Sequence, residues 1–176
     1  MIAKLCTWAP SRTEAIEYMR LALDQFEVEG IGHNLPFLSA VMDHPTFVSG
    51  AITTAFIGEE YPDGFTGAQL AEPMLRKIAA SCAAMHRVAE IRRAKISDRL
   101  DNHERKVGDD WVVTLGGQRY EIVINADPQG STVRFADKAE LRVSSDWTPG
   151  TALAEMMVDG APLVMKTTKI PGGFHV

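Results

Sequence analysis

From Ala9 to Glu60 the apolar residues recur with helical spacing, interrupted by short polar breaks. The first of these helices has a defined start, because Ser11 and Glu14 form a capping box in which each side chain can bond the other residue's backbone amide. The apolar residues that follow are three or four positions apart and therefore share one helix face. They are Ile16, Met19, Leu23 and Phe26.

Shorter elements surround this helix. Residues 1–8 and 27–31 alternate between apolar and polar side chains, which predicts two short strands. The first of them begins at the start of the sequence with no residues before it, which fits either a simple edge strand or a chain cut from a larger protein. Asn34 suits the N-cap of a second helix, which we expect to end before Pro45. A third short helix is expected near residues 54–60.

A proline and a glycine within Tyr61–Phe65 interrupt both helical and strand patterns and mark a domain boundary. A long helix follows, from about Ala68 to Ile96, and its apolar and small residues cover most of its sides. Such a helix is usually buried on most sides. Its cations gather at the far end, where they suit the negative pole of the helix dipole. We therefore expect two domains, residues 1–64 and 65–176.

After residue 108 the apolar period changes to two, which predicts strands. Turn sequences separate these strands at Gly116-Gly117, Asp127–Gly130, Thr148–Gly150 and Asp159-Gly160. About seven short strands joined by such tight turns make an antiparallel meander. The predicted fold is α+β: a small lobe of helices and short strands, then a long central helix wrapped by an antiparallel β-barrel of those strands. A curved open sheet with the helix across one face is the alternative.

Composition narrows the classes of function. The chain has 176 residues, a formal net charge of −5 and a pI near 5.5, whereas nucleic-acid-binding domains usually carry a basic surplus. No apolar run approaches the roughly 20 residues that span a bilayer, and no signal peptide is evident. The two cysteines suit a reducing compartment better than a disulfide framework. We expect a cytoplasmic protein, or one of the mitochondrial matrix in a eukaryote, that binds neither nucleic acid nor membranes.

Groups for catalysis or metal binding do not stand out in the sequence. The five histidines have no His-x-x-x-His or Cys-x-x-Cys partner spacing. His86 is better explained as a hydrogen-bonded core residue, and Asp43-His44 as a helix terminus. Gly116-Gly117 lacks the following helix that phosphate binding uses. We therefore expect no catalytic, cofactor-binding or metal site in this chain.

A family resemblance begins in the first 50 residues, MIAKLCTWAPSRTEAIEYMRLALDQFEVEGIGHNLPFLSAVMDHPTFVSG. The segment MIAKL, the helix after it, GIGHN and HPTFVSG resemble the end of a biotin carboxylase domain, and the match continues to about Glu60. The junction FIGEEYPDGF, residues 56–65, resembles propionyl-CoA carboxylase alpha subunits more than their methylcrotonyl or bacterial acetyl-CoA relatives. The chain is thus similar to part of an alpha subunit of the biotin-dependent acyl-CoA carboxylases.

This resemblance implies that residues 67–176 correspond to the middle domain of the family, an antiparallel barrel around a long central helix. That domain links the biotin carboxylase and carboxyltransferase parts. The resemblance also implies that the polar segment 98–108 docks onto the carboxyltransferase beta subunit. The residues it indicates for docking are polar or charged: Arg99, Asp101, Asn102, His103, Arg105 and Lys106. The last strand of the barrel is expected to lie beyond Val176.

The rest of such a subunit would lie outside these residues. The resemblance implies an inactive fragment that holds no cofactor, from a parent enzyme that uses biotin, ATP and Mg²⁺. Its partners would be the beta subunit and the parent's own biotin carboxylase and biotin carrier domains. Met165-Lys166 is not expected to be a biotin site, because Thr167 stands where the biotinyl motif has Met. An independent small ligand-binding or regulatory module that uses the β-barrel remains the alternative.

Overall fold

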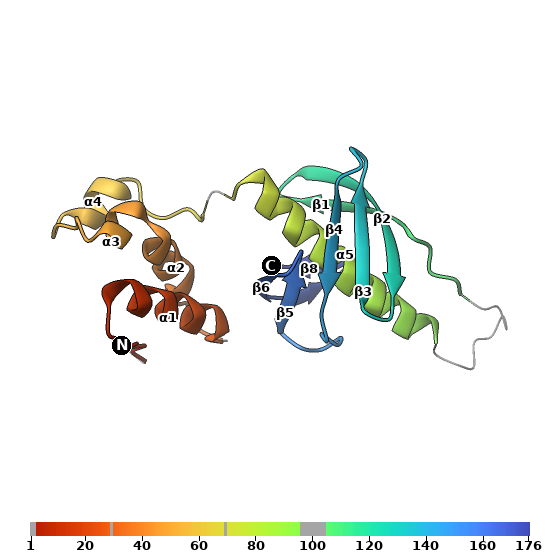
Figure 1. The fold of residues 1–176 in the computed structure, drawn as a ribbon, viewed down its shortest axis with the longest axis horizontal. Coiled ribbons are helices and arrows are strands. Elements are labelled where there is room, and N and C mark those ends of the chain that lie inside the picture. The colour runs from red at the N-terminus through yellow and green to blue at the C-terminus, as the bar shows by residue number, and fades with distance from the viewer. Residues whose placement is uncertain (1–2, 29, 69, 96–104) are drawn as a thin grey trace. The chain divides into compact units, whose positions relative to one another are not determined.

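The computed structural model describes residues 3–28, 30–68, 70–95 and 105–176. The chain forms two compact units, Met1–Gln69 and Leu70–Val176 (Figure 1). Between Tyr61 and Leu70 the described residues form neither helix nor strand. The boundary predicted after residue 64 lies within this stretch.

Helices make up the regular structure of the first unit. They are α1 (Arg12–Gln25), α2 (Leu35–Asp43), α3 (Pro45–Ser49) and α4 (Phe56–Glu60). The predicted capping box starts α1: the amide of Glu14 donates to the Ser11 hydroxyl oxygen at 3.3 Å, and the amide of Ser11 donates to the Glu14 carboxylate at 3.1 Å. Ile16 and Leu23 on the apolar face of α1 are buried. The start of this helix and its buried face are therefore confirmed.

The two strands predicted for this unit, at residues 1–8 and 27–31, are wrong. Where the structure describes these segments, they are irregular. An isolated strand is not stable without hydrogen-bonded neighbours, and the described part of this unit contains no strand with which either segment could pair. The helix α2 ends before Pro45 as predicted. A further short helix then starts at Pro45, because proline fits the first turn of a helix.

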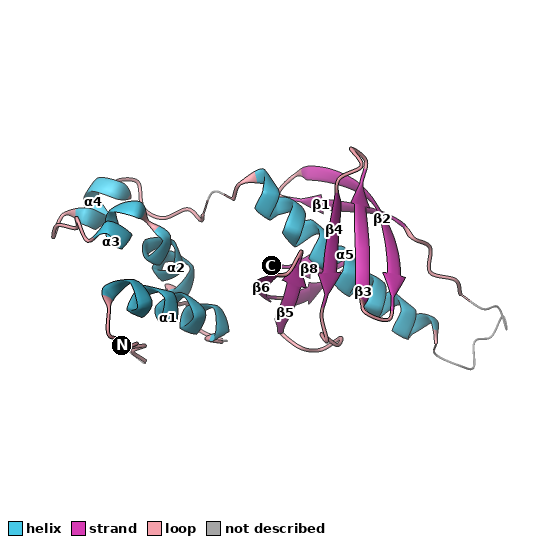
Figure 2. Cartoon of the chain, in the orientation of Figure 1, coloured by secondary structure: helices cyan, strands magenta, loops and turns pink. Residues whose placement is uncertain are grey.

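The second unit consists of a long helix followed by strands. The helix is α5 (Glu72–Ala94), and the strands are β1 (Asp110–Leu115), β2 (Gln118–Asp127), β3 (Gly130–Phe135), β4 (Glu140–Ser144), β5 (Leu153–Val158), β6 (Ala161–Lys166), β7 (Thr168–Ile170) and β8 (Gly173–His175). The strands β1 to β6 form one antiparallel sheet in chain order, and β7 pairs with β8 in a separate hairpin (Figure 2). The predicted turn at Asp159-Gly160 is confirmed, since both residues have the positive φ that a two-residue hairpin turn requires.

The six-stranded sheet curls around α5 without closing (Figure 1). Among the described strands, β1 pairs only with β2 and β6 pairs only with β5. The predicted closed barrel of about seven strands therefore overstates the closure, and the alternative of a curved open sheet describes these six strands better. The physical reason is size: neighbouring strands lie about 4.8 Å apart, so six strands are too few to enclose an α-helix that is about 10 Å across with its side chains.

The core lies between α5 and the concave face of the sheet. Small residues come from the helix, where Ala79, Ala80 and Ala83 are at most 3% exposed. Larger residues come from the strands and pack over them: Tyr120, Ile122, Ile124, Val133, Phe135, Val143, Met156, Val158 and Met165. Because the alanine side chains are short, the helix can approach the sheet closely, and the larger side chains of the strands fill the interior. The prediction that the long helix is buried on most of its sides is confirmed.

Candidate functional site

The predicted docking residues follow α5 in the chain. Outside the described residues lie four of them: Arg99, Asp101, Asn102 and His103. Arg105 and Lys106 are described, and both are exposed. Arg105 donates a hydrogen bond to the carboxylate of Glu90 on α5. The described part of the predicted docking segment therefore contacts the C-terminal end of α5.

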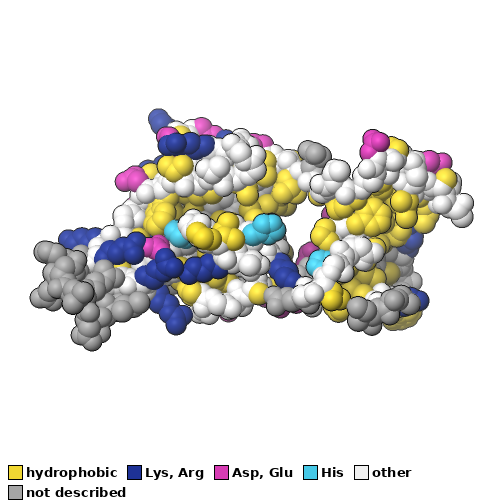
Figure 3. All heavy atoms as spheres, turned by 180° about the vertical axis from the view of Figure 1, so that it is seen from behind, with side chains coloured by type: hydrophobic (Ala, Val, Ile, Leu, Met, Phe, Trp, Pro, Cys, Tyr) yellow, Lys and Arg dark blue, Asp and Glu magenta, His cyan; other side chains and the backbone are white. Residues whose placement is uncertain are grey.

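Cations gather at this end of the second unit (Figure 3). The exposed ones are Arg92, Arg93, Lys95, Arg105 and Lys106. The amide of Lys95 donates to the carbonyl of Ile91 at 3.2 Å, which closes the last turn of the helix. Positive side chains at a helix C-terminus are stabilised by the helix dipole. The end of α5 is thus a basic surface on a chain whose formal net charge is −5.

Glu90 is buried beneath these cations, with only 5% of its surface exposed. One of its carboxylate oxygens accepts a hydrogen bond from Arg93 at 2.7 Å, and the other accepts one from Arg105. Burial alone would raise the pKa of Glu90, but the hydrogen bonds and charges of the two arginines hold that pKa below its usual value. The carboxylate is therefore ionised at neutral pH and neutralised by two guanidinium groups.

A second ion pair lies one turn earlier on the helix. The guanidinium of Arg87 lies 3.1 Å from the carboxylate of Asp109. The indole nitrogen of Trp111 donates to the carbonyl oxygen of Gly108 at 3.0 Å, just before β1 begins. Residues 105 to 109 are therefore attached to the last turns of α5. Sequence reasoning missed this attachment, because both ion pairs join residues that are far apart in the chain.

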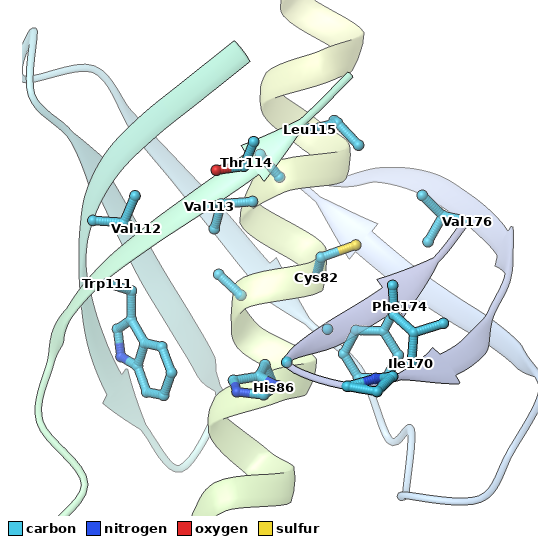
Figure 4. A pocket seen from close by; sticks show the side chains of 15 residues that line it. Cys82, His86, Trp111, Val112, Val113, Thr114, Leu115, Ile170, Phe174 and Val176 are labelled. Atoms are coloured by element: carbon cyan, nitrogen blue, oxygen red, sulfur yellow. The ribbon is translucent and has the colours of Figure 1, made fainter. Parts of the chain in front are cut away.

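A pocket of about 360 Å³ opens along the side where the sheet does not close (Figure 4). Strand β1, from Trp111 to Leu115, lines one wall, and Ile170–Phe174 of the β7–β8 hairpin lines the other. The α5 side chains Cys82 and His86 point into it from between these walls. The ring of His86 packs edge-on against Trp111, with centroids 5.4 Å apart. His86 was predicted to be a hydrogen-bonded core residue, but it is half-buried and lines this pocket.

The pocket offers little for nucleophilic or metal chemistry. Burial raises the pKa of the Cys82 thiol to about 11, so the reactive thiolate is scarce at neutral pH. In residues 3–28, 30–68, 70–95 and 105–176, no group of three or more His, Cys, Asp or Glu side chains could hold a metal ion. Lys166, the lysine of the Met165-Lys166 pair, lies at the end of β6 opposite Leu153 and is half-buried. None of the helices that the structure describes has the length and apolar character to cross a membrane.

Two family models match this chain, one after the other. The biotin carboxylase C-terminal domain matches residues 1–59, which make up most of the first unit. The propionyl-coenzyme A carboxylase BT domain matches residues 78–176, which cover most of α5 and all of the strands. The order of the two matches is the order implied by the sequence resemblance.

Curated proteins similar to the chain are alpha chains of propionyl-CoA carboxylase. The alpha chain of Ruegeria pomeroyi is 68% identical over all of this chain and 26% of its own length. The mitochondrial alpha chain of Rattus norvegicus is 30% identical over 91% of this chain and 22% of its own length. A biotin carboxylase of Halalkalibacterium halodurans is 49% identical over 57 residues, 32% of this chain and 13% of its own length. The chain thus spans about a quarter of the length of the alpha chains it matches.

Proposed function

Because the chain belongs to the propionyl-coenzyme A carboxylase BT domain family, with a biotin carboxylase C-terminal segment before that domain, we propose that it is a scaffold and docking part of such an alpha subunit. The second unit docks onto the carboxyltransferase beta subunit. The first unit completes one lobe of the biotin carboxylase domain. The chain contributes shape and contact surfaces, and the groups that make and break bonds belong to other parts of the enzyme.

The parent enzyme, in this proposal, uses ATP, Mg²⁺ and bicarbonate to carboxylate biotin. The carboxyl group then passes to propionyl-CoA on the beta subunit. The partners of this chain are the beta subunit and the biotin carboxylase and biotin carrier domains of the parent. Biotin, ATP and Mg²⁺ bind to the parent outside these residues. We propose a cytoplasmic location, or the mitochondrial matrix in a eukaryote. The names of the rat and mouse relatives describe those proteins as mitochondrial.

The observation that carries the proposal is the pairing of two family matches in one chain, each on a separate compact unit. The packing of the second unit supports a docking role. The interior between α5 and the sheet is occupied by side chains such as Ala80, Ile124 and Val133, each 0% exposed. A body with a filled core presents its outer surface to partners, and here the surface at the end of α5 carries clustered cations.

Size-exclusion chromatography with a propionyl-CoA carboxylase beta subunit tests the proposal. We expect the purified chain to co-elute with the beta subunit, and the affinity to fall when Arg105 and Lys106 are both changed to Glu. The matched control reverses charges elsewhere on the second unit: Arg119→Glu with Lys138→Glu, both on exposed residues, should leave co-elution unchanged. Failure of the unaltered chain to co-elute would refute docking. Bicarbonate-dependent ATP cleavage by the chain alone would refute the inactive-scaffold part.

A second candidate function rests on the pocket between β1 and the β7–β8 hairpin. Its volume of about 360 Å³ is within the range of small-molecule sites. The chain would then be an independent ligand-binding module. Saturable binding of biotin or an acyl-CoA that Cys82→Trp abolishes would favour this candidate over the scaffold. We expect no such binding, because the pocket is open along one side and has few polar groups that could orient a ligand.

A further inference from the structure

Glu90 is a charged residue that is buried on α5, with 5% of its surface exposed. Within the parts of the chain that the structure describes, the other buried polar side chains, Ser81 and Thr167, are neutral. An ionised carboxylate taken out of water is costly unless partners surround it. The position lies on the last turns of α5, close to residues 105–109 rather than to the alanine-rich centre of the helix.

Two arginines from different parts of the chain supply those partners. Arg93 is three residues further along the same helix and binds one carboxylate oxygen at 2.7 Å. Arg105 stands beyond the end of the helix and binds the other oxygen. The buried carboxylate therefore joins the helix to the segment that begins at Arg105. A hydrogen bond to a charged group is about twice as strong as a neutral one, which makes this junction firm.

The Arg87–Asp109 ion pair gives the junction a direction. Along the helix, Arg87 precedes Glu90 by three residues, or nearly one turn, whereas along the returning segment Asp109 follows Arg105. The two pairs therefore set residues 105–109 antiparallel to the end of α5. One pair alone would leave this segment free to pivot, and two pairs fix both its position and its direction.

We infer that Glu90 is a positioning residue for partner docking, because its carboxylate, shared between Arg93 and Arg105, holds residues 105–109 against α5 in one arrangement. This inference rests on the proposed docking function. Arg105 has a double role in it: its guanidinium is part of the exposed basic surface, and its bond to Glu90 fixes where that surface lies. Glu90 itself, at 5% exposure, has almost no surface with which to touch a partner.

The matched comparison is between two glutamates that are paired with arginine. Glu90→Gln removes the buried charge and keeps the shape of the side chain. Glu121→Gln makes the same change in the Arg119–Glu121 pair on the sheet, where both side chains are 65% exposed and 3.3 Å apart. Exposed pairs contribute little to stability, so this control measures the effect of a Glu-to-Gln change alone. Arg105→Lys is a further variant, since it keeps the charge and loses the forked geometry.

Two measurements are made on each variant: affinity for the carboxyltransferase beta subunit, and the NMR order parameters of the backbone amides of residues 105–109 in the free chain. We expect Glu90→Gln to weaken affinity by about tenfold and to lower the order parameters of this segment while those of the strands stay high. Glu121→Gln should change neither. Arg105→Lys should lower the order parameters of this segment as Glu90→Gln does, and this measurement decides the question if Glu90→Gln does not fold, because Arg105 also belongs to the docking surface.

The outcomes separate the two levels of the proposal. If the unaltered chain does not bind the beta subunit, the docking function fails and the role of Glu90 falls with it. If the unaltered chain binds, and Glu90→Gln binds equally well, only the positioning role is overturned. A loss of affinity without lower order parameters at residues 105–109 would also overturn it, because the effect would then not act through the position of this segment.

Discussion

Arg142 and Asp127 form a bidentate ion pair in which two guanidinium nitrogens of β4 each lie 2.6 Å from a carboxylate oxygen at the end of β2. The same carboxylate accepts the amide of Gln129 at 2.7 Å, within the turn to β3. The Asp127 side chain therefore joins β2, β4 and the turn between β2 and β3. The hydrogen bonds from Arg142 and then from Gln129 lower the pKa of Asp127 from 3.8 to about 2.

An acid titration should show the effect of Arg142 on the pKa of Asp127. A carboxylate whose pKa is lowered by folding stabilises the folded state above its unfolded pKa, and that stabilisation is lost as the pH falls through the folded pKa. For Asp127 the window lies between pH 3.8 and about 2. We expect an NMR titration to give Asp127 a pKa near 2, and Arg142→Met to return it toward 3.8. Arg134→Met, which breaks the Arg134–Glu140 pair, should leave it unchanged; an ordinary Asp127 pKa in the unaltered chain would contradict the prediction.

Ser81 is fully buried in α5, and its hydroxyl has no hydrogen-bond partner among the described residues. Removing an unsatisfied buried hydroxyl and introducing a better helix former should both stabilise the folded state. We expect Ser81→Ala to raise the free energy of unfolding by up to about 1 kcal/mol. The matched control is Thr167→Val, which removes a buried hydroxyl that donates to Ala152 at 3.1 Å and should cost about 1 kcal/mol. Urea denaturation measures both; a large loss of stability in Ser81→Ala would reveal a partner for the hydroxyl.

Gly130 begins β3 with a φ of 145°, and a Cβ atom there would lie 2.5 Å from the carbonyl oxygen of Val143. Backbone atoms cannot move aside cheaply. We therefore expect Gly130→Ala to lower the free energy of unfolding by at least about 2 kcal/mol. Gly116→Ala is the control: its φ is 56° but a Cβ would meet open space, so the cost should be near 1 kcal/mol, that of a left-handed residue. Equal losses in the two variants would contradict the close approach of β3 to β4.

The two thiols should differ in reactivity. Burial raises the pKa of Cys82 to about 11, which leaves about one thiol in a thousand ionised at pH 8, whereas Cys6 is exposed. We expect iodoacetamide at pH 8 to alkylate Cys6 well before Cys82 in the folded chain, and both at similar rates in guanidinium chloride. Mass spectrometry of the peptides measures the two rates. Equally fast labelling of Cys82 in the folded chain would show that the pocket opens more widely than the structure has it.

Local patterns predicted much of the fold correctly. The capping box at Ser11, the helix that ends before Pro45 and the turn at Asp159-Gly160 each depend on a few neighbouring residues, and the structure confirms all three. The strands predicted at residues 1–8 and 27–31 failed for the opposite reason. Alternation of side chains is a local property, whereas a strand exists only beside another strand.

At the candidate site, too, some features were predicted and others depended on residues that are distant in the sequence. The family resemblance indicated a polar docking segment from 98 to 108, and Arg105 and Lys106 within it are exposed. It did not indicate Glu90 as the partner of Arg105, because the two residues are 15 positions apart and only the fold brings them together. The family resemblance carried the docking hypothesis, and neither spacing nor composition could have led to it.

The sequence by itself determined where α5 lies, which of its faces are apolar, and where the strands turn, since these follow from periodicity, capping and backbone preferences over a few residues. The tertiary structure decided how far the sheet closes, that Glu90 is shared by Arg93 and Arg105, and that Cys82 is shielded enough to hold its proton. Each of these depends on which surfaces are removed from water when distant segments pack together. A short stretch of sequence does not determine which distant segments it will contact.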